Sequence, residues 1–86
     1  MDQTEILEII NQYNSTDRQT IKANLRRLMI NYNIKPNNIT ELGFARNNVY
    51  AWTNQTSNNI PMFEQALKIA SKYEFSIEEF LKQLAN

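Results

Sequence analysis

The stretch GFARNNVYAW, residues 43–52, holds the only glycine and the only tryptophan of the chain. A glycine adopts positive φ at little cost, so Gly43 is suited to a sharp turn between two helices. Val49 and Trp52 lie one helical turn apart, which places both on one side of a short helix over residues 46–53. If those two side chains enter the core, the arginine and asparagines beside them point into solvent.

A second short helix is expected just before this glycine. Pro36 suits its first turn, because proline has no amide hydrogen to lose there. Ile39 and Leu42 would face inward. A short helix, a tight glycine turn and another short helix form the pattern of a helix-turn-helix. The outer face of the second helix, together with its leading end, is then the candidate binding surface.

Amphipathic spacing predicts two helices before this pair and no convincing strand. The first covers residues 3–13, and Asp2 with Glu5 resembles its N-terminal cap pair. The second starts at residue 16 or 17 and ends at Asn33, because asparagine tolerates positive φ.

Two more helices are expected after the polar loop 54–59. Pro61 should open one of them, with Phe63, Leu67 and Ala70 on its inner face. The last should start at a capping box formed by Ser76 and Glu79, with Phe75 stapled against Phe80. Its apolar side would comprise Ile77, Phe80, Leu81 and Leu84.

The length and the helical spacing together predict one all-α domain of 86 residues, divided into an accessory helix at 1–15 and the helix-turn-helix unit at 16–86. There is no cysteine and no histidine, which removes the common zinc ligands and the usual general base near neutral pH. We therefore expect no metal, no cofactor and no enzymatic activity. No apolar run is long enough to span a bilayer, and we expect a cytoplasmic protein.

The net charge is zero, but the charges are unevenly placed. Residues 18–63 carry six basic side chains and a single acid, Glu41, whereas residues 1–17 carry four acids and no base. A basic middle between acidic ends could orient a polyanion on one face. Helix-surface charge that clusters by chance remains an equal alternative.

Residues 21–81 resemble the lambda-repressor-like helix-turn-helix family, also called XRE-type regulators. The resemblance rests on an ordered set of motifs: LRRLM at 25–29, ITELG at 39–43, Val49 and Trp52 beyond the glycine, and IPMFEQALKIASKYEFSIEEFL at 60–81. It implies a five-helix bundle, here with an extra N-terminal helix. It also implies a phage or mobile-element type repressor, which binds an inverted-repeat operator in double-stranded DNA as a homodimer.

The resemblance further implies which residues meet the DNA. Family members commonly read bases with the residues three, four and eight past the turn glycine, here Arg46, Asn47 and Ala51, and Asn48 and Tyr50 lie beside them. Arginine pairs bidentately with guanine and asparagine with adenine. The candidates for phosphate contact are Lys22, Arg26, Lys35, Asn37, Asn38, Asn54, Gln55, Thr56 and Ser57.

The chain departs from the family pattern at several positions. Pro36 lies within the usual opening of the first motif helix, Met29 replaces a family arginine, and residues 54–57 contain no lysine or arginine. With the neutral net charge, these departures keep a second hypothesis open: a protein-binding module on the same scaffold, such as an antirepressor, a mobile-element inhibitor or an antitoxin-like partner. The helix at 3–13, which Leu7 makes more widely apolar, would serve dimerisation or a protein partner.

Overall fold

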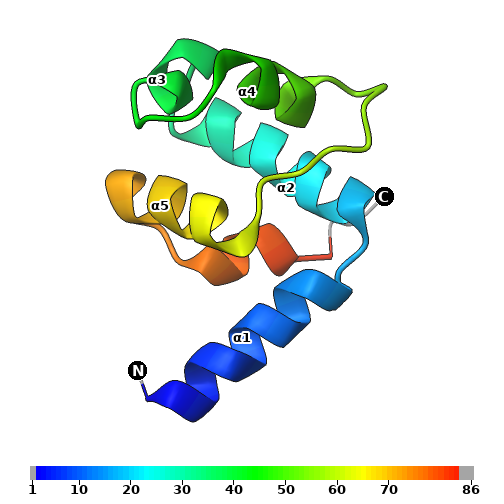
Figure 1. The fold of residues 1–86 in the computed structure, drawn as a ribbon, viewed down its shortest axis with the longest axis vertical. Coiled ribbons are helices and arrows are strands. Elements are labelled where there is room, and N and C mark those ends of the chain that lie inside the picture. The colour runs from blue at the N-terminus through cyan, green and yellow to red at the C-terminus, as the bar shows by residue number, and fades with distance from the viewer. Residues whose placement is uncertain (1, 84–86) are drawn as a thin grey trace.

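The computed structural model describes residues 2–83, and this part of the chain contains five α-helices and one short 3-10 helix. In chain order they are α1 (Gln3–Ser15), α2 (Arg18–Asn31), α3 (Pro36–Thr40), α4 (Arg46–Thr53), α5 (Phe63–Tyr73) and η1 (Ile77–Leu81). No strand occurs in this range, and none of its helices has the length and hydropathy needed to cross a lipid bilayer. Figure 1 shows α3 and α4 at one end of the molecule and α1 at the other.

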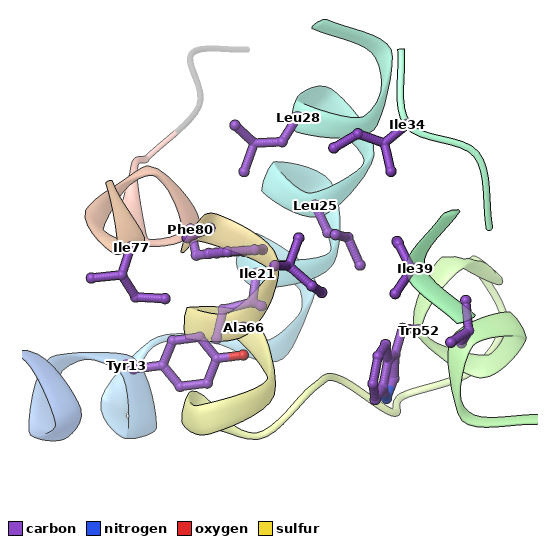
Figure 2. Close-up of a cluster of buried hydrophobic side chains, with 13 residues drawn as sticks. Tyr13, Ile21, Leu25, Leu28, Ile34, Ile39, Trp52, Ala66, Ile77 and Phe80 are labelled. Atoms are coloured by element: carbon purple, nitrogen blue, oxygen red, sulfur yellow. The ribbon is translucent and has the colours of Figure 1, made fainter. Parts of the chain in front are cut away.

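The central helix α2 contributes a stripe of buried side chains to the core. Ile21, Leu25 and Leu28 recur at spacings of four and three, and each is at most 1% exposed. In Figure 2 this stripe lies between Trp52 on the side of α4 and Phe80 on the side of η1. Complete burial of each such side chain contributes about 1.5–3 kcal/mol, so α2 holds the two ends of the molecule together.

The N-terminal helix α1 is anchored by its second half. The Tyr13 side chain is 2% exposed, its ring meets those of Phe63 and Phe80 edge-on, and its hydroxyl donates to the carbonyl of Pro61. Burial raises the pKa of the Tyr13 hydroxyl far above its ordinary value. The first half of α1, up to Glu8, is exposed.

Several helix boundaries follow the predicted signals. The Asp2 carboxylate accepts the Glu5 amide at the start of α1, and the Asp17 carboxylate accepts two amides at the start of α2. Asn33 lies two residues after the last residue of α2 and has a left-handed backbone conformation, with a φ of 54°. Pro36 is the first residue of α3. These caps satisfy amides and carbonyls that helix ends otherwise leave without partners.

Three details of the last two helices correct the prediction. The first turn of α5 begins at Phe63 rather than Pro61, because Met62 keeps an extended backbone as the N-cap residue. Leu67 lies on the exposed side of α5. The final helix is a 3-10 segment without the expected capping box, because the Ser76 hydroxyl accepts the amide of Glu78 and the Glu79 carboxylate faces away. Phe75 does pack against Phe80, while Leu84 lies outside the described residues.

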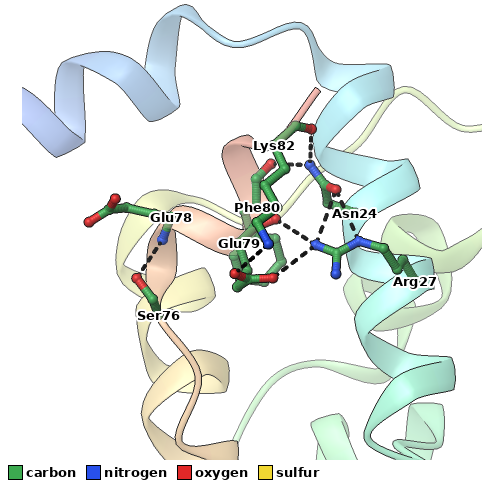
Figure 3. A network of polar contacts seen from close by, with 7 residues as sticks. All are labelled: Asn24, Arg27, Ser76, Glu78, Glu79, Phe80 and Lys82. Atoms are coloured by element: carbon green, nitrogen blue, oxygen red, sulfur yellow. Dashed lines mark hydrogen bonds and ion pairs between the residues drawn. The ribbon is translucent and has the colours of Figure 1, made fainter. Parts of the chain in front are cut away.

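The Glu79 carboxylate and a buried amide instead tie η1 to α2, as Figure 3 shows. Glu79 forms ion pairs with Arg27 at 3.3 Å and with Lys82 at 2.9 Å. Hydrogen bonding to Lys82, helped by the charges of Lys82 and Arg27, lowers the pKa of the Glu79 carboxyl although its burial opposes this. Asn24, which is fully buried, donates to the carbonyls of Phe80 and Lys82.

Candidate nucleic-acid interface

The turn between α3 and α4 sets the position of the candidate surface. Gly43 has a φ of +105°, a conformation that residues with a Cβ rarely adopt. Val49 and Trp52 are buried on the inner side of α4, and the Trp52 ring packs edge-on against Phe44. The Lys68 ammonium lies 5.3 Å from the centre of the Phe44 ring, so α5 also supports the turn. These contacts confirm the predicted seating of the second motif helix.

The opposite side of α4 is open to solvent. Arg46, Asn47 and Asn48 are exposed in its first turn, Tyr50 is 50% exposed, and Ala51 is half-buried. Within residues 2–83, the side chains of Arg46, Asn47, Asn48 and Tyr50 make no hydrogen bond to the protein. An unengaged guanidinium and two unengaged amides on one short helix can therefore meet hydrogen-bonding groups of a ligand without first breaking internal bonds.

Lys22 corrects the predicted set of phosphate-binding residues. Its side chain is 2% exposed, and its ammonium donates to the carbonyls of Ala51 at 2.9 Å, Trp52 at 3.0 Å and Asn59 at 3.0 Å. An ammonium has three donors, so none is left for phosphate. Burial, assisted by the positive charge of Arg26, lowers the pKa of Lys22. This lysine positions the end of α4 and the loop after it.

Arg26 and Lys35 remain as accessible cations beside α4. Lys35 is exposed and Arg26 is half-buried, and both line a groove that reaches Thr53 at the end of α4. Arg26 also borders a neighbouring groove with Gln55. With Arg46 at the opposite end of α4, three cations therefore flank the candidate surface along its length.

The start of α3 supplies two further predicted residues. Asn37 is exposed and Asn38 is half-buried. The side-chain oxygen of Asn38 accepts the Lys35 amide at 2.8 Å, which caps this end of α3. Phosphate oxygens accept hydrogen bonds, so the Asn38 NH₂ group remains available to donate to one while its oxygen holds the cap.

The loop after α4 has fewer available donors than its composition indicates. The Asn54 side-chain oxygen accepts both the amide and the hydroxyl of Thr56, so Thr56 supports Asn54 and has no donor left for phosphate in this arrangement. The Ser57 hydroxyl accepts the Asn59 amide and can still donate its proton. Donors for phosphate therefore remain on Asn54, Gln55 and Ser57.

Comparison with family models, with curated proteins and with solved structures finds no match for this chain. The arrangement of the residues themselves is therefore the basis for inferring function.

Three structural roles were not predicted from the sequence, those of Lys22, Asn24 and Arg27. Lys22 occupies a helix position compatible with a surface role, and the carbonyls that bind it lie 29 to 37 residues further along the chain. Asn24 is one turn before Leu28 on the inner side of α2, and the signal available was a polar residue adjoining an apolar stripe. Such a residue is normally buried only with partners. Arg27, also on α2, is half-buried beside Glu79.

Proposed function

We propose that this protein is a DNA-binding regulator with a lambda-repressor-like helix-turn-helix, in which α4 enters the major groove of double-stranded DNA in the cytoplasm. The observation that carries the proposal is the exposed arginine and amide surface on a helix fixed by Val49, Trp52 and Lys22. Arginine and asparagine side chains match the hydrogen-bonding edges of guanine and adenine. Arg46 and Asn47 would read bases, with Asn48, Tyr50 and Ala51 beside them.

Phosphate contacts would come from both sides of α4. Arg26 and Lys35 flank its end, the Asn37 and Asn38 amides lie at the start of α3, and Asn54, Gln55 and Ser57 donate from the loop. Such contacts fix the register of a protein on the duplex without reading sequence. In a homodimer, two α4 helices about 34 Å apart would read an inverted repeat, with one half-site in each of two successive major grooves. The proposed role is a repressor of the phage or mobile-element type, without enzymatic activity.

The proposal is tested by selecting bound fragments from a random duplex library and then measuring the affinity of variants for the selected site. Arg46→Ala and Asn47→Ala should each lose about 1–3 kcal/mol of discrimination between the selected and a scrambled site. Matched controls are Lys72→Ala on α5 and Asn11→Ala on α1, both exposed and far from α4 in sequence. If Arg46→Ala and Asn47→Ala discriminate between sites as well as the wild type does, α4 is not the reading helix.

Salt dependence separates the two roles open to Arg46. Two phosphate contacts by Arg26 and Lys35 would reduce affinity roughly twelve-fold between 50 and 200 mM salt, since each contact adds about 0.9 to the logarithmic slope, and a third phosphate contact by Arg46 would make the reduction roughly forty-fold. Removing a phosphate contact lowers that slope by about one, whereas removing a base contact lowers discrimination and changes the slope much less. Arg46→Ala should follow the second pattern and Lys35→Ala the first.

A protein-binding module is the second candidate, and the inward-facing donors favour it. Lys22 and Thr56 both bond within the protein, and the net charge is zero, so the electrostatic attraction to DNA is modest. On this alternative, an antirepressor-like, inhibitor-like or antitoxin-like protein would bind another protein through the same scaffold. Absence of binding to any duplex in the library at 50 mM salt would favour this candidate over DNA binding.

A further inference from the structure

Arg26 is half-buried on α2, yet its guanidinium has no hydrogen-bond or ion-pair partner within residues 2–83. The neighbouring Arg27 shows the usual arrangement, since it donates to Asn24 and pairs with Glu79. A guanidinium presents five N–H donors, and polar groups that are removed from water normally have partners. Arg26 is therefore arranged to receive an acceptor from outside the chain.

Two grooves meet at Arg26. The first, here named the α3 groove, lies between the end of α2 and the start of α3 and is lined by Arg26, Met29, Ile30, Asn33, Ile34, Lys35 and Thr53. The second, the loop groove, lies between α2 and the loop after α4 and is lined by Gln19, Lys22, Ala23, Arg26 and Gln55. Arg26 belongs to both linings, and neither lining contains an acid. Both grooves therefore favour an anion.

The loop that forms one wall of the loop groove is held to α2 at several points. Lys22 donates to the carbonyl of Asn59 at 3.0 Å, and Arg18 donates to the carbonyl of Asn58 at 3.1 Å. Burial lowers the pKa of Lys22, and the positive charge of Arg26 lowers it further, as expected beside a guanidinium that no acid neutralises. The groove thus keeps its shape without a ligand, and its free positive charge comes from Arg26.

Each groove adds donors of its own to those of Arg26. In the α3 groove these are the ammonium of Lys35 and the side-chain amide of Asn33, which are both exposed. In the loop groove the exposed amide of Gln55 makes no side-chain hydrogen bond within residues 2–83. Gln19 uses one amide hydrogen in a long contact to the loop and keeps the other. Each groove can therefore hold one anion between its own donors and the shared guanidinium.

We propose that Arg26 bridges two successive phosphates of one DNA strand, with one phosphate in each groove. Ala23, Arg26 and Ile30 follow one another at intervals of three and four residues on one side of α2, so the two grooves succeed each other over about 10 Å. That length exceeds a single phosphate group and accommodates two neighbours on a strand, which carries its charges at short, regular intervals. The forked guanidinium donates in two directions and can serve both phosphates, whereas an ammonium acts as a single point charge.

This inference rests on the proposed DNA binding and adds to it the adjacency of two phosphates and the residue that joins them. Phosphate ethylation interference on the selected duplex is the test. Ethylation removes the charge of a phosphate, so for the wild type it should weaken binding at two adjacent phosphates in each half-site. Arg26→Ala should weaken binding about tenfold or more and remove the sensitivity at both phosphates. Lys35→Ala should remove it at one of them and Gln55→Ala at the other, while Lys72→Ala on α5 should leave both.

The conservative variant separates bridging from charge alone. Arg26→Lys keeps the positive charge but lacks the fork, so sensitivity should remain at no more than one of the two phosphates. If Arg26→Ala weakens binding but leaves both sensitivities, its role is structural and the bridge is refuted, and relief at a single phosphate refutes it equally. In both cases the duplex is still bound, so the proposed DNA binding stands. If no duplex is bound at about 50 mM salt, DNA binding itself fails and the bridge fails with it.

Inorganic phosphate, added to the protein without DNA, separates a phosphate of the DNA backbone from a free one. A free ion fills one groove only, so the NMR resonance of the Arg26 Nε–H should shift without reaching saturation below about 10 mM phosphate. Saturation in the micromolar range would assign the site to the free ion and overturn the proposal.

Discussion

Replacing Lys22 with methionine should destabilise the protein substantially, although lysine is usually a surface residue. Methionine keeps most of the length and apolar volume of the lysine stem and removes the ammonium. The carbonyls of Ala51, Trp52 and Asn59 would then lose their shared donor. Two of these carbonyls lie at the end of α4, which has no basic residue in its last turn, so Lys22 also supplies the positive charge that a helix C-terminus favours.

The magnitude follows from the burial of each bond. A buried acceptor left without a partner costs about 1–3 kcal/mol. The bond to Trp52 is buried, whereas those to Ala51 and Asn59 are partly buried, and water can partly replace the donor there. Relief from burying a charge offsets some of the loss. We expect a net destabilisation of about 2–4 kcal/mol, out of a total of about 4–13 kcal/mol for a domain of this size.

Urea denaturation followed by tryptophan fluorescence provides the assay, because Trp52 is the single tryptophan and its carbonyl is one of the three acceptors. The melting temperature should fall by roughly 8–32 °C, from about 4–8 °C per kcal/mol in a domain of this length. Lys35→Met, at an exposed position, is the matched control and should change stability by less than about 0.5 kcal/mol. If Lys22→Met unfolds at the same urea concentration as this control, the ammonium does not hold α4 in place.

Three further substitutions test the turn and the tie between α2 and η1. Gly43→Ala should cost about 1–2 kcal/mol in urea denaturation, since a φ of +105° is strained with any Cβ; an unchanged midpoint would show that the turn relaxes freely. Asn24→Leu removes the amide that donates to the carbonyls of Phe80 and Lys82. The substitution should lower the free energy of unfolding by about 1–3 kcal/mol, and a variant as stable as the wild type would mean that water replaces the amide. Glu79 has a lowered pKa in the folded state, so its stabilising contribution is present above its ordinary pKa of 4.5 and is lost as pH falls through the folded value. The stability difference between wild type and Glu79→Gln, from melts over pH 2–7, should therefore shrink as the solution becomes acidic, and a constant difference would contradict this assignment.

Local signals in the sequence predicted the positions of the helices and the seating of α4. Gly43, Pro36 and Asn33 act through their own backbone preferences, and Val49 with Trp52 acts through helical spacing, so each is visible without knowledge of the fold. The starts of α1 and α2 depend on similarly local caps, at Asp2 and Asp17. Such features can be predicted from the sequence because their physical cause lies within a few residues of the position that they determine.

The errors concern residues whose partners are distant along the chain. The sequence makes Lys22 a candidate for phosphate contact, because nothing local distinguishes a lysine with three carbonyl acceptors from one in water. Glu79 was assigned to a capping box from its spacing to Ser76, but Arg27 and Lys82 compete for the same carboxylate. Charge-assisted contacts of this kind are stronger than a neutral cap, and only tertiary structure reveals the competition.

Lys22 and Arg26 lie four residues apart on α2, yet they have different roles on the same side of the molecule. The Lys22 ammonium donates all three of its hydrogen bonds within the protein. Arg26 instead lines a groove that reaches the end of α4. Because the buried ammonium holds the carbonyl end of α4, it fixes the helix relative to the helix that carries Arg26. Any base contact by Arg46 and any phosphate contact by Arg26 would thus share one rigid frame. Rigid placement lowers the entropy cost of forming both contacts together, which partly compensates for the small number of cations that the surface presents.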